Sequence, residues 1–146
     1  MPRPMTVPER EAFLSDARVG VVSVDDEDGR GPLARPIWYG YEPGGVVTLL
    51  TGGGSRKVKL IRQQGRFSLT VQSEAQPYAY VSVEGPVVAF EEGVDPDERR
   101  AIHERYLGAE AAAQVLAETE RYARTQVTIR MRPERWSTAD YSGDHS

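Results

Sequence analysis

Short apolar runs, separated by turn signals, divide the chain into strands with a few helices between them. Runs rich in β-branched and aromatic residues predict strands at about 19–24, 33–41, 46–51, 67–71, 78–90 and 127–131. Capping signals and apolar spacing predict helices over about 6–17, 55–64, 95–107 and 109–122. Most consecutive strands are joined by hairpin-length turns, which is typical of antiparallel pairing.

This order of elements predicts a mainly β fold with helices (α+β), a six-stranded antiparallel barrel rather than a doubly wound sheet. Pro36 within the second strand indicates an edge position or a bulge, and Gly85-Pro86 indicates a bend in the long fifth strand. The length of 146 residues predicts one domain over 1–146, with 1–5 and 140–146 as loose tails.

Composition excludes several kinds of chemistry. The chain has no cysteine, so disulfides and thiolate chemistry are absent, and no apolar run predicts a signal peptide or a membrane span. We therefore expect a cytoplasmic protein that binds no membrane, and the net charge of −4 argues against a nucleic-acid partner. His103 and His145 have no second ligand at metal spacing, so we expect no metal site and place His103 on the surface.

The clearest candidate site is the segment Thr51–Lys57, with the sequence TGGGSRK. Here a strand end, three glycines and a predicted helix start at Ser55 come together, and such a start offers free N–H groups to an anion. Arg56 and Lys57 add positive charge, in a tract that holds five basic residues and no acid: Arg56, Lys57, Lys59, Arg62 and Arg66. The segment predicts either a phosphate site or a solvated polar turn. It is not the P-loop of nucleoside triphosphatases, because the Gly-Lys-Ser/Thr ending of that motif is missing.

Four blocks, at 29–39, 49–57, 66–69 and 81–85, resemble in order and spacing the pyridoxamine 5′-phosphate oxidase-like, FMN-binding split β-barrel superfamily. A fifth, Pro133-Glu134-Arg135-Trp136, resembles actinobacterial flavin- or deazaflavin-dependent oxidoreductases. The resemblance implies a homodimer with the cofactor at the subunit interface. The implied cofactor is FMN or coenzyme F420, with FAD less expected.

The resemblance also implies a set of cofactor-binding residues, while no catalytic residue is assigned. The set is Arg35, Pro36, Ile37, Trp38, Leu50, Thr51, Ser55, Arg56, Lys57, Tyr80 and Trp136. Within it, Arg56 and Lys57 match the family's phosphate grip, and Trp136 is expected to reach the cofactor of the partner. We expect the substrate to lie near Trp38, Tyr39 and Tyr80, although the aromatic residues around Trp38 also fit a plain barrel core.

Departures from the family pattern restrict the activity. Gly40 stands where the pyridoxine-phosphate oxidases have a substrate-binding lysine, Tyr80 replaces a flavin-contacting glutamine, and their C-terminal arginine elements are missing. Leu60 stands where many deazaflavin relatives have asparagine. We therefore expect an oxidoreductase that moves a hydride to or from a small organic substrate other than vitamin B6 phosphate. The alternative is a non-catalytic flavin- or haem-binding carrier on the same fold.

Overall fold

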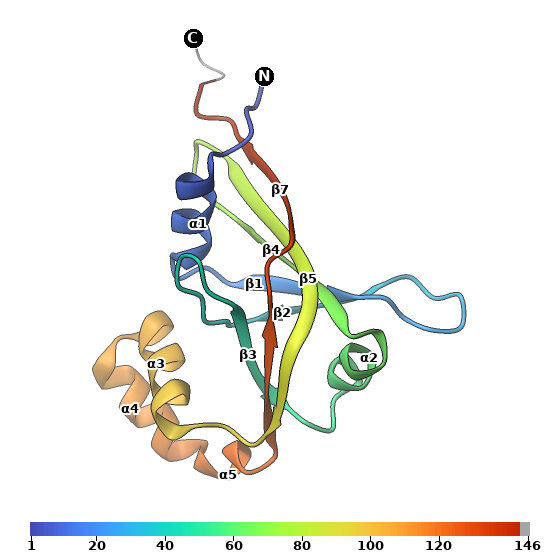
Figure 1. Cartoon of the computed structure of the whole chain (residues 1–146). Helices are drawn as coiled ribbons and strands as arrows, with labels where there is room; N and C mark the ends of the chain where they lie inside the picture. Colours follow the sequence, from blue (N-terminus) through green and yellow to red (C-terminus); the bar gives the residue numbers. More distant parts are fainter. Residues whose placement is uncertain (144–146) are drawn as a thin grey trace.

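The computed structural model describes residues 1–143 (Figure 1). The strands are β1 (Gly20–Val24), β2 (Leu33–Ile37), β3 (Val47–Gly52), β4 (Arg66–Gln72), β5 (Ala79–Glu92), β6 (Gln126–Met131) and β7 (Arg135–Asp140). The helices are α1 (Val7–Ser15), α2 (Arg56–Gln64), α3 (Pro96–Leu107), α4 (Ala109–Glu118) and α5 (Glu120–Ala123). None of the described helices is both long and apolar enough to cross a bilayer.

The strands form one curled antiparallel sheet in the order β2-β1-β4-β5-β6-β3. The long strand β5 connects its two halves, because residues up to Pro86 pair with β4 and residues from Val87 pair with β6. The register shifts between Val87 and Ala89, so the predicted irregularity is a bulge next to Gly85-Pro86. The predicted class, an α+β split barrel, is confirmed, and Pro36 lies on the edge strand β2 as expected.

Both ends of the chain are more ordered than the sequence pattern predicts. A seventh strand, β7, pairs with β5 beside β6, although its alternation of small and polar residues gave no strand signal. The expected tails are partly tied down, because the backbones of Arg3 and Asp140 exchange hydrogen bonds of 3.0 and 2.8 Å. The rest of the second expected tail, 144–146, lies outside the described residues.

Helices close the interior of the barrel. Leu14 from α1 and Val58, Leu60 and Ile61 from α2 are almost fully buried, in one cluster with the inward residues of the strands. Leu60 has no exposed surface, so the position that is asparagine in many deazaflavin relatives points into the core in this chain. The burial of these apolar residues fixes which face of α2 meets the sheet and therefore which residues its first turn presents outward.

Candidate functional site

The two ends of the sheet, β2 and β3, are joined by a loop but diverge from one another. The backbones of Gly40 and Thr48 exchange two hydrogen bonds of 2.9 Å, which closes the loop. Continuing this antiparallel register would set Trp38 opposite Leu50 and Pro36 opposite Gly52, yet no pairing between β2 and β3 continues among the described strands. The edges of β2 and β3 that face each other are therefore left without a ladder, and this divergence is the split of the barrel.

Five of the expected cofactor-binding residues flank this split. Pro36, Ile37 and Trp38 lie on or just after β2, while Leu50 and Thr51 lie near the end of β3. The structure thus brings together two groups that are more than ten residues apart in the sequence. Thr51 is only 7% exposed, so its hydroxyl offers little surface to a ligand.

We call the segment Thr51–Lys57, at the start of α2, the cradle. Its conformation is set by local sequence. Ser55 is the N-cap, and its hydroxyl accepts a 3.3 Å hydrogen bond from the N–H of Val58. The N–H of Gly53 donates to the carbonyl of Thr125 at 2.7 Å, which fixes the glycine segment against the loop before β6. A Cβ added at Gly52 or Gly54 would meet open space. The first-turn N–H groups of α2 therefore lie beside an uncrowded backbone, as an anion site requires.

Lys57 and Arg35 form a pair of cations at this cradle. Lys57 is half-buried, and both its burial and the charge of Arg35 lower the pKa of its ammonium group. The register of β2 pairs Arg35 with the buried Val22, so both side chains leave the sheet on the same face, where Arg35 is exposed. Neither cation has an acidic partner among the described residues. Two like charges held together without an acid favour a bound anion.

Arg56 is placed differently from the sequence-based expectation. Its Nε and Nη2 bind the carboxylate of Asp26 at 3.3 and 2.5 Å, and the side chain of Asp26 is only 3% exposed. The hydrogen bond from Arg56 lowers the pKa of Asp26, and the N–H of Glu27 contributes in the same direction. Arg56 is thus an ion-paired residue that keeps Nη1 for a further acceptor, rather than an uncompensated charge.

The remaining basic residues of the tract are mostly compensated by acids from other elements. Arg62 pairs with Glu92 at 2.9 Å and Arg66 pairs with Glu134 at 3.2 Å. Within the described part of the chain, only the two lysines of the tract have no ion pair. In the sequence, five positive charges lie close together. In the fold, the charge that acids leave unpaired is that of Lys57 and of the exposed Lys59.

Residues of α3 pack against Trp38, on the side of the split that β2 forms. The ring of Trp38 stacks on Tyr106 with centroids 4.7 Å apart, and His103 meets Trp38 edge-on at 5.8 Å. His103 is half-buried against this stack, so it keeps part of its surface while Trp38 covers the rest. Tyr39 has no exposed surface, and its hydroxyl donates to the carbonyl of Leu14 at 2.6 Å. Tyr39 is therefore core, and the expectation that it borders the substrate is wrong.

Tyr80 and Trp136 do not meet the cradle within this chain. Tyr80 lies on β5 opposite Gln72, with its ring 6.2 Å from that of Tyr78. Trp136 lies on β7, and its ring contacts the guanidinium of Arg10 at 4.5 Å. Their expected contact with a cofactor stays a prediction that needs a second copy of the chain.

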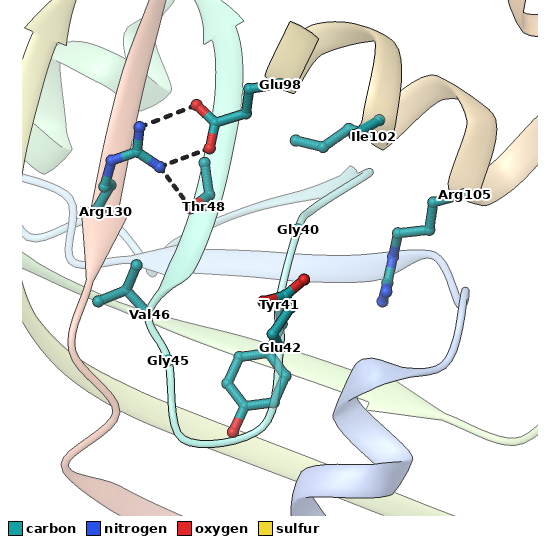
Figure 2. Close-up of a pocket in the computed structure, with 11 residues that line it drawn as sticks. Gly40, Tyr41, Glu42, Gly45, Val46, Thr48, Glu98, Ile102, Arg105 and Arg130 are labelled. Atoms are coloured by element: carbon teal, nitrogen blue, oxygen red, sulfur yellow. Dashed lines mark hydrogen bonds and ion pairs between the residues drawn. The ribbon is translucent and has the colours of Figure 1, made fainter.

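A cavity of about 560 Å³ lies at the closed end of the split, between the loop after β2 and helix α3 (Figure 2). Arg130 of β6 makes two hydrogen bonds to Glu98, at 2.7 and 2.9 Å, and a third to the hydroxyl of Thr48 at 3.0 Å. A Cβ added at Gly40 would lie 3.3 Å from Cδ1 of Ile102. The side chain of Ile102 thus occupies the space into which a residue at position 40 would project.

The fold defines a split-barrel protein, and the start of α2 is its candidate anion site. A family model described as pyridoxamine 5′-phosphate oxidase matches residues 6–140, and the chain belongs to this family. No curated protein matches the sequence.

Solved structures of the same fold come from proteins of varied description. An F420 reductase is 21% identical, with a TM-score of 0.70 over 87% of this chain and 94% of its own. A conserved hypothetical protein from Mycobacterium tuberculosis is 22% identical, with a TM-score of 0.73 over 94% and 86%. A FAD-binding protein from Mesorhizobium loti is 20% identical, with a TM-score of 0.61 over 96% of each chain. At these identities the likeness shows a shared fold and nothing more.

Proposed function

We propose that this protein is an oxidoreductase that binds the phosphate of FMN or coenzyme F420 at the start of α2. The observation that carries the proposal is the half-buried Lys57, set beside Arg35 with no acid in the described chain to neutralise either. The solved structures that share this fold include an F420 reductase and a FAD-binding protein, which supports a flavin-type cofactor.

The residues present fit such a group. Lys57, Arg35 and the free Nη1 of Arg56 supply positive charge, and Ser55 together with the first-turn N–H groups supplies hydrogen bonds. The diverging strands leave backbone edges near Pro36 and Leu50 for the ring system. When bound, a flavin or deazaflavin supplies the hydride chemistry itself. The protein then has to hold and orient it, which agrees with the lack of an evident catalytic acid or base among residues 1–143.

The site is proposed to be completed by a second copy of the chain. Val19 and Val21 are 54% and 39% exposed at the start of β1, next to the edge strand β2. An isologous two-fold contact would cover these apolar residues. It would also allow Trp136 of the second copy to contact the cofactor. We therefore propose a homodimer.

A binding series tests the cofactor proposal. Titrations of FMN, FAD and coenzyme F420 are compared for the parent, Lys57→Gln and Lys59→Gln, which differ in burial on the same helix. Loss of a charge-assisted bond predicts binding of FMN or F420 about tenfold to a hundredfold weaker for Lys57→Gln, with little change for Lys59→Gln. Riboflavin, which has no phosphate, should bind both variants equally. Equal binding of the phosphorylated cofactors to parent and Lys57→Gln would refute the proposal.

The structure also changes which basic residues we expect to contribute most to phosphate binding. Because Asp26 already holds Arg56, we expect Arg56→Ala to weaken binding less than Arg35→Gln or Lys57→Gln. Oxidation of the reduced cofactor by a quinone acceptor, followed spectroscopically, then separates an enzyme from a carrier. Turnover above the rate of the free cofactor supports the enzyme, and binding without turnover supports the carrier.

A further inference from the structure

A second cavity lies between the start of α3 and the α4–α5 segment. Its volume is about 410 Å³, within the range of small-molecule sites. Apolar side chains form much of its wall, and they are Val94, Pro96, Leu116, Ala117 and Ala123. Its charged residues are Arg99, Arg100, Glu120 and Arg124.

Arg99 is the unusual member of this wall, because it is a buried charge without a counter-charge. It is 7% exposed, and no carboxylate of the described chain lies within ion-pair distance of it. Its Nη2 donates to the carbonyl and the hydroxyl of Thr119 at 3.2 and 2.8 Å, and both of these acceptors are neutral. Its buried Nε has no hydrogen-bond partner in the described part of the chain.

A structural role accounts for part of this arrangement. Thr119 is the C-cap of α4, and a helix C-terminus carries about half a negative charge. Arg99 therefore stabilises the end of α4, yet half a charge does not balance a full one that has been taken out of water. The missing counter-charge, together with a partly apolar cavity at the same place, leaves a position for an anionic partner.

We propose that this cavity binds a small monocarboxylate with an apolar tail, such as a medium-chain fatty acid. The carboxylate pairs with the positive charge of the Arg99 guanidinium, which lines the cavity. Arg124, exposed and without an ion pair in the described chain, adds attraction for the anion. The tail packs against Leu116 and Val94.

The wall favours a singly charged, amphiphilic anion over a phosphate. Glu120 lines the same cavity and repels a doubly charged group more than a carboxylate. Arg100 is engaged by Asp97 at 3.3 Å, which reduces the positive charge that it offers. The cavity and the cradle share no lining residue, although Thr125, which holds Gly53 of the cradle, directly follows Arg124 of the cavity wall.

Calorimetric titration with sodium octanoate tests the proposal on the full chain, with 1-octanol as the uncharged probe. The parent should bind octanoate at least about tenfold more tightly than octanol, since only octanoate pairs with Arg99. Arg99→Gln should remove this preference. Ala117→Trp, at an exposed position of the wall, should fill the cavity and abolish binding of both probes while leaving the fold intact.

Two matched controls make the result specific. Arg121→Gln removes an exposed arginine that bonds to Tyr122 outside the cavity wall, and it should bind octanoate like the parent, whereas Arg124→Gln should bind it more weakly. Lys57→Gln, which tests the cradle, should leave octanoate binding unchanged. Equal affinity for octanoate and octanol, no binding at about 10 mM octanoate, or unchanged binding by Ala117→Trp would each overturn the proposal.

Discussion

Arg56 at the start of α2 is held by the buried carboxylate of Asp26, which comes from the turn between β1 and β2. Two atoms of the guanidinium bond to this carboxylate, at 2.5 and 3.3 Å, and its side chain is 3% exposed. The ion pair links the turn to the cradle. Asp26 thus fixes the position of a residue that the sequence marked as a free phosphate ligand.

This pair predicts a pH-dependent contribution to stability. The pKa of Asp26 lies below its ordinary value of 3.8 in the folded protein, because Arg56 bonds to the carboxylate. Its stabilising effect is therefore complete above the unfolded pKa and is lost as the pH falls through the lower, folded pKa. Melting temperatures of the parent and Asp26→Asn should differ at neutral pH and converge below pH 3.8. A difference that stays constant to the lowest pH would show that the ion pair contributes nothing.

Gly85 should not tolerate any side chain. A Cβ there would lie 1.8 Å from the carbonyl oxygen of Arg132, at the point where β5 passes from one half of the barrel to the other. The backbone must move, so Gly85→Ala should lower the free energy of unfolding by about 3 kcal/mol or more. Gly31→Ala is the matched control, since nothing lies within 4 Å of its Cβ. Urea unfolding that finds the two variants equally stable would contradict the packing described at Gly85.

Pyridoxamine 5′-phosphate should not be a substrate, although the chain belongs to the family described by that activity. Gly40 offers no side chain to bind it, and Ile102 fills the adjacent volume. We expect no turnover above background when hydrogen peroxide release is measured with FMN bound. An efficiency of about 10⁴ M⁻¹s⁻¹ or more would show that the departure at position 40 has been misinterpreted.

The proposed homodimer predicts that one charged substitution on β1 separates the two copies. Val21 is 39% exposed on β1, and Val21→Glu would place a charge in the proposed interface. Sedimentation at micromolar concentration should find a dimer for the parent and a monomer for Val21→Glu. Val88→Glu, at an exposed position on β5, serves as the control for a general loss of solubility. A monomeric parent that binds cofactor normally would exclude the dimer as part of the site.

The sequence alone determined features that are made within a few residues. Ser55 and Asp95 cap α2 and α3 as predicted, and Gly65 ends α2 in the left-handed conformation with φ 69°. The capping box of Thr6 and Glu9 is also present. Local hydrogen bonds and backbone preferences suffice for these, so a single pass along the chain finds them. The cradle TGGGSRK was found for the same reason.

Only the tertiary structure decided how charges and faces are paired. Asp26 and Arg56 are thirty residues apart, and the pairing of Arg99 with Thr119 depends on how α3 meets α4. Strand β7 has no strong pattern of its own and exists because β5 offers it a free edge. Tyr39 was misplaced because burial depends on which elements pack together, and in this protein α3 covers the end of β2. Local pattern set the elements and the cradle, while long-range packing set which of its charges remain for a ligand.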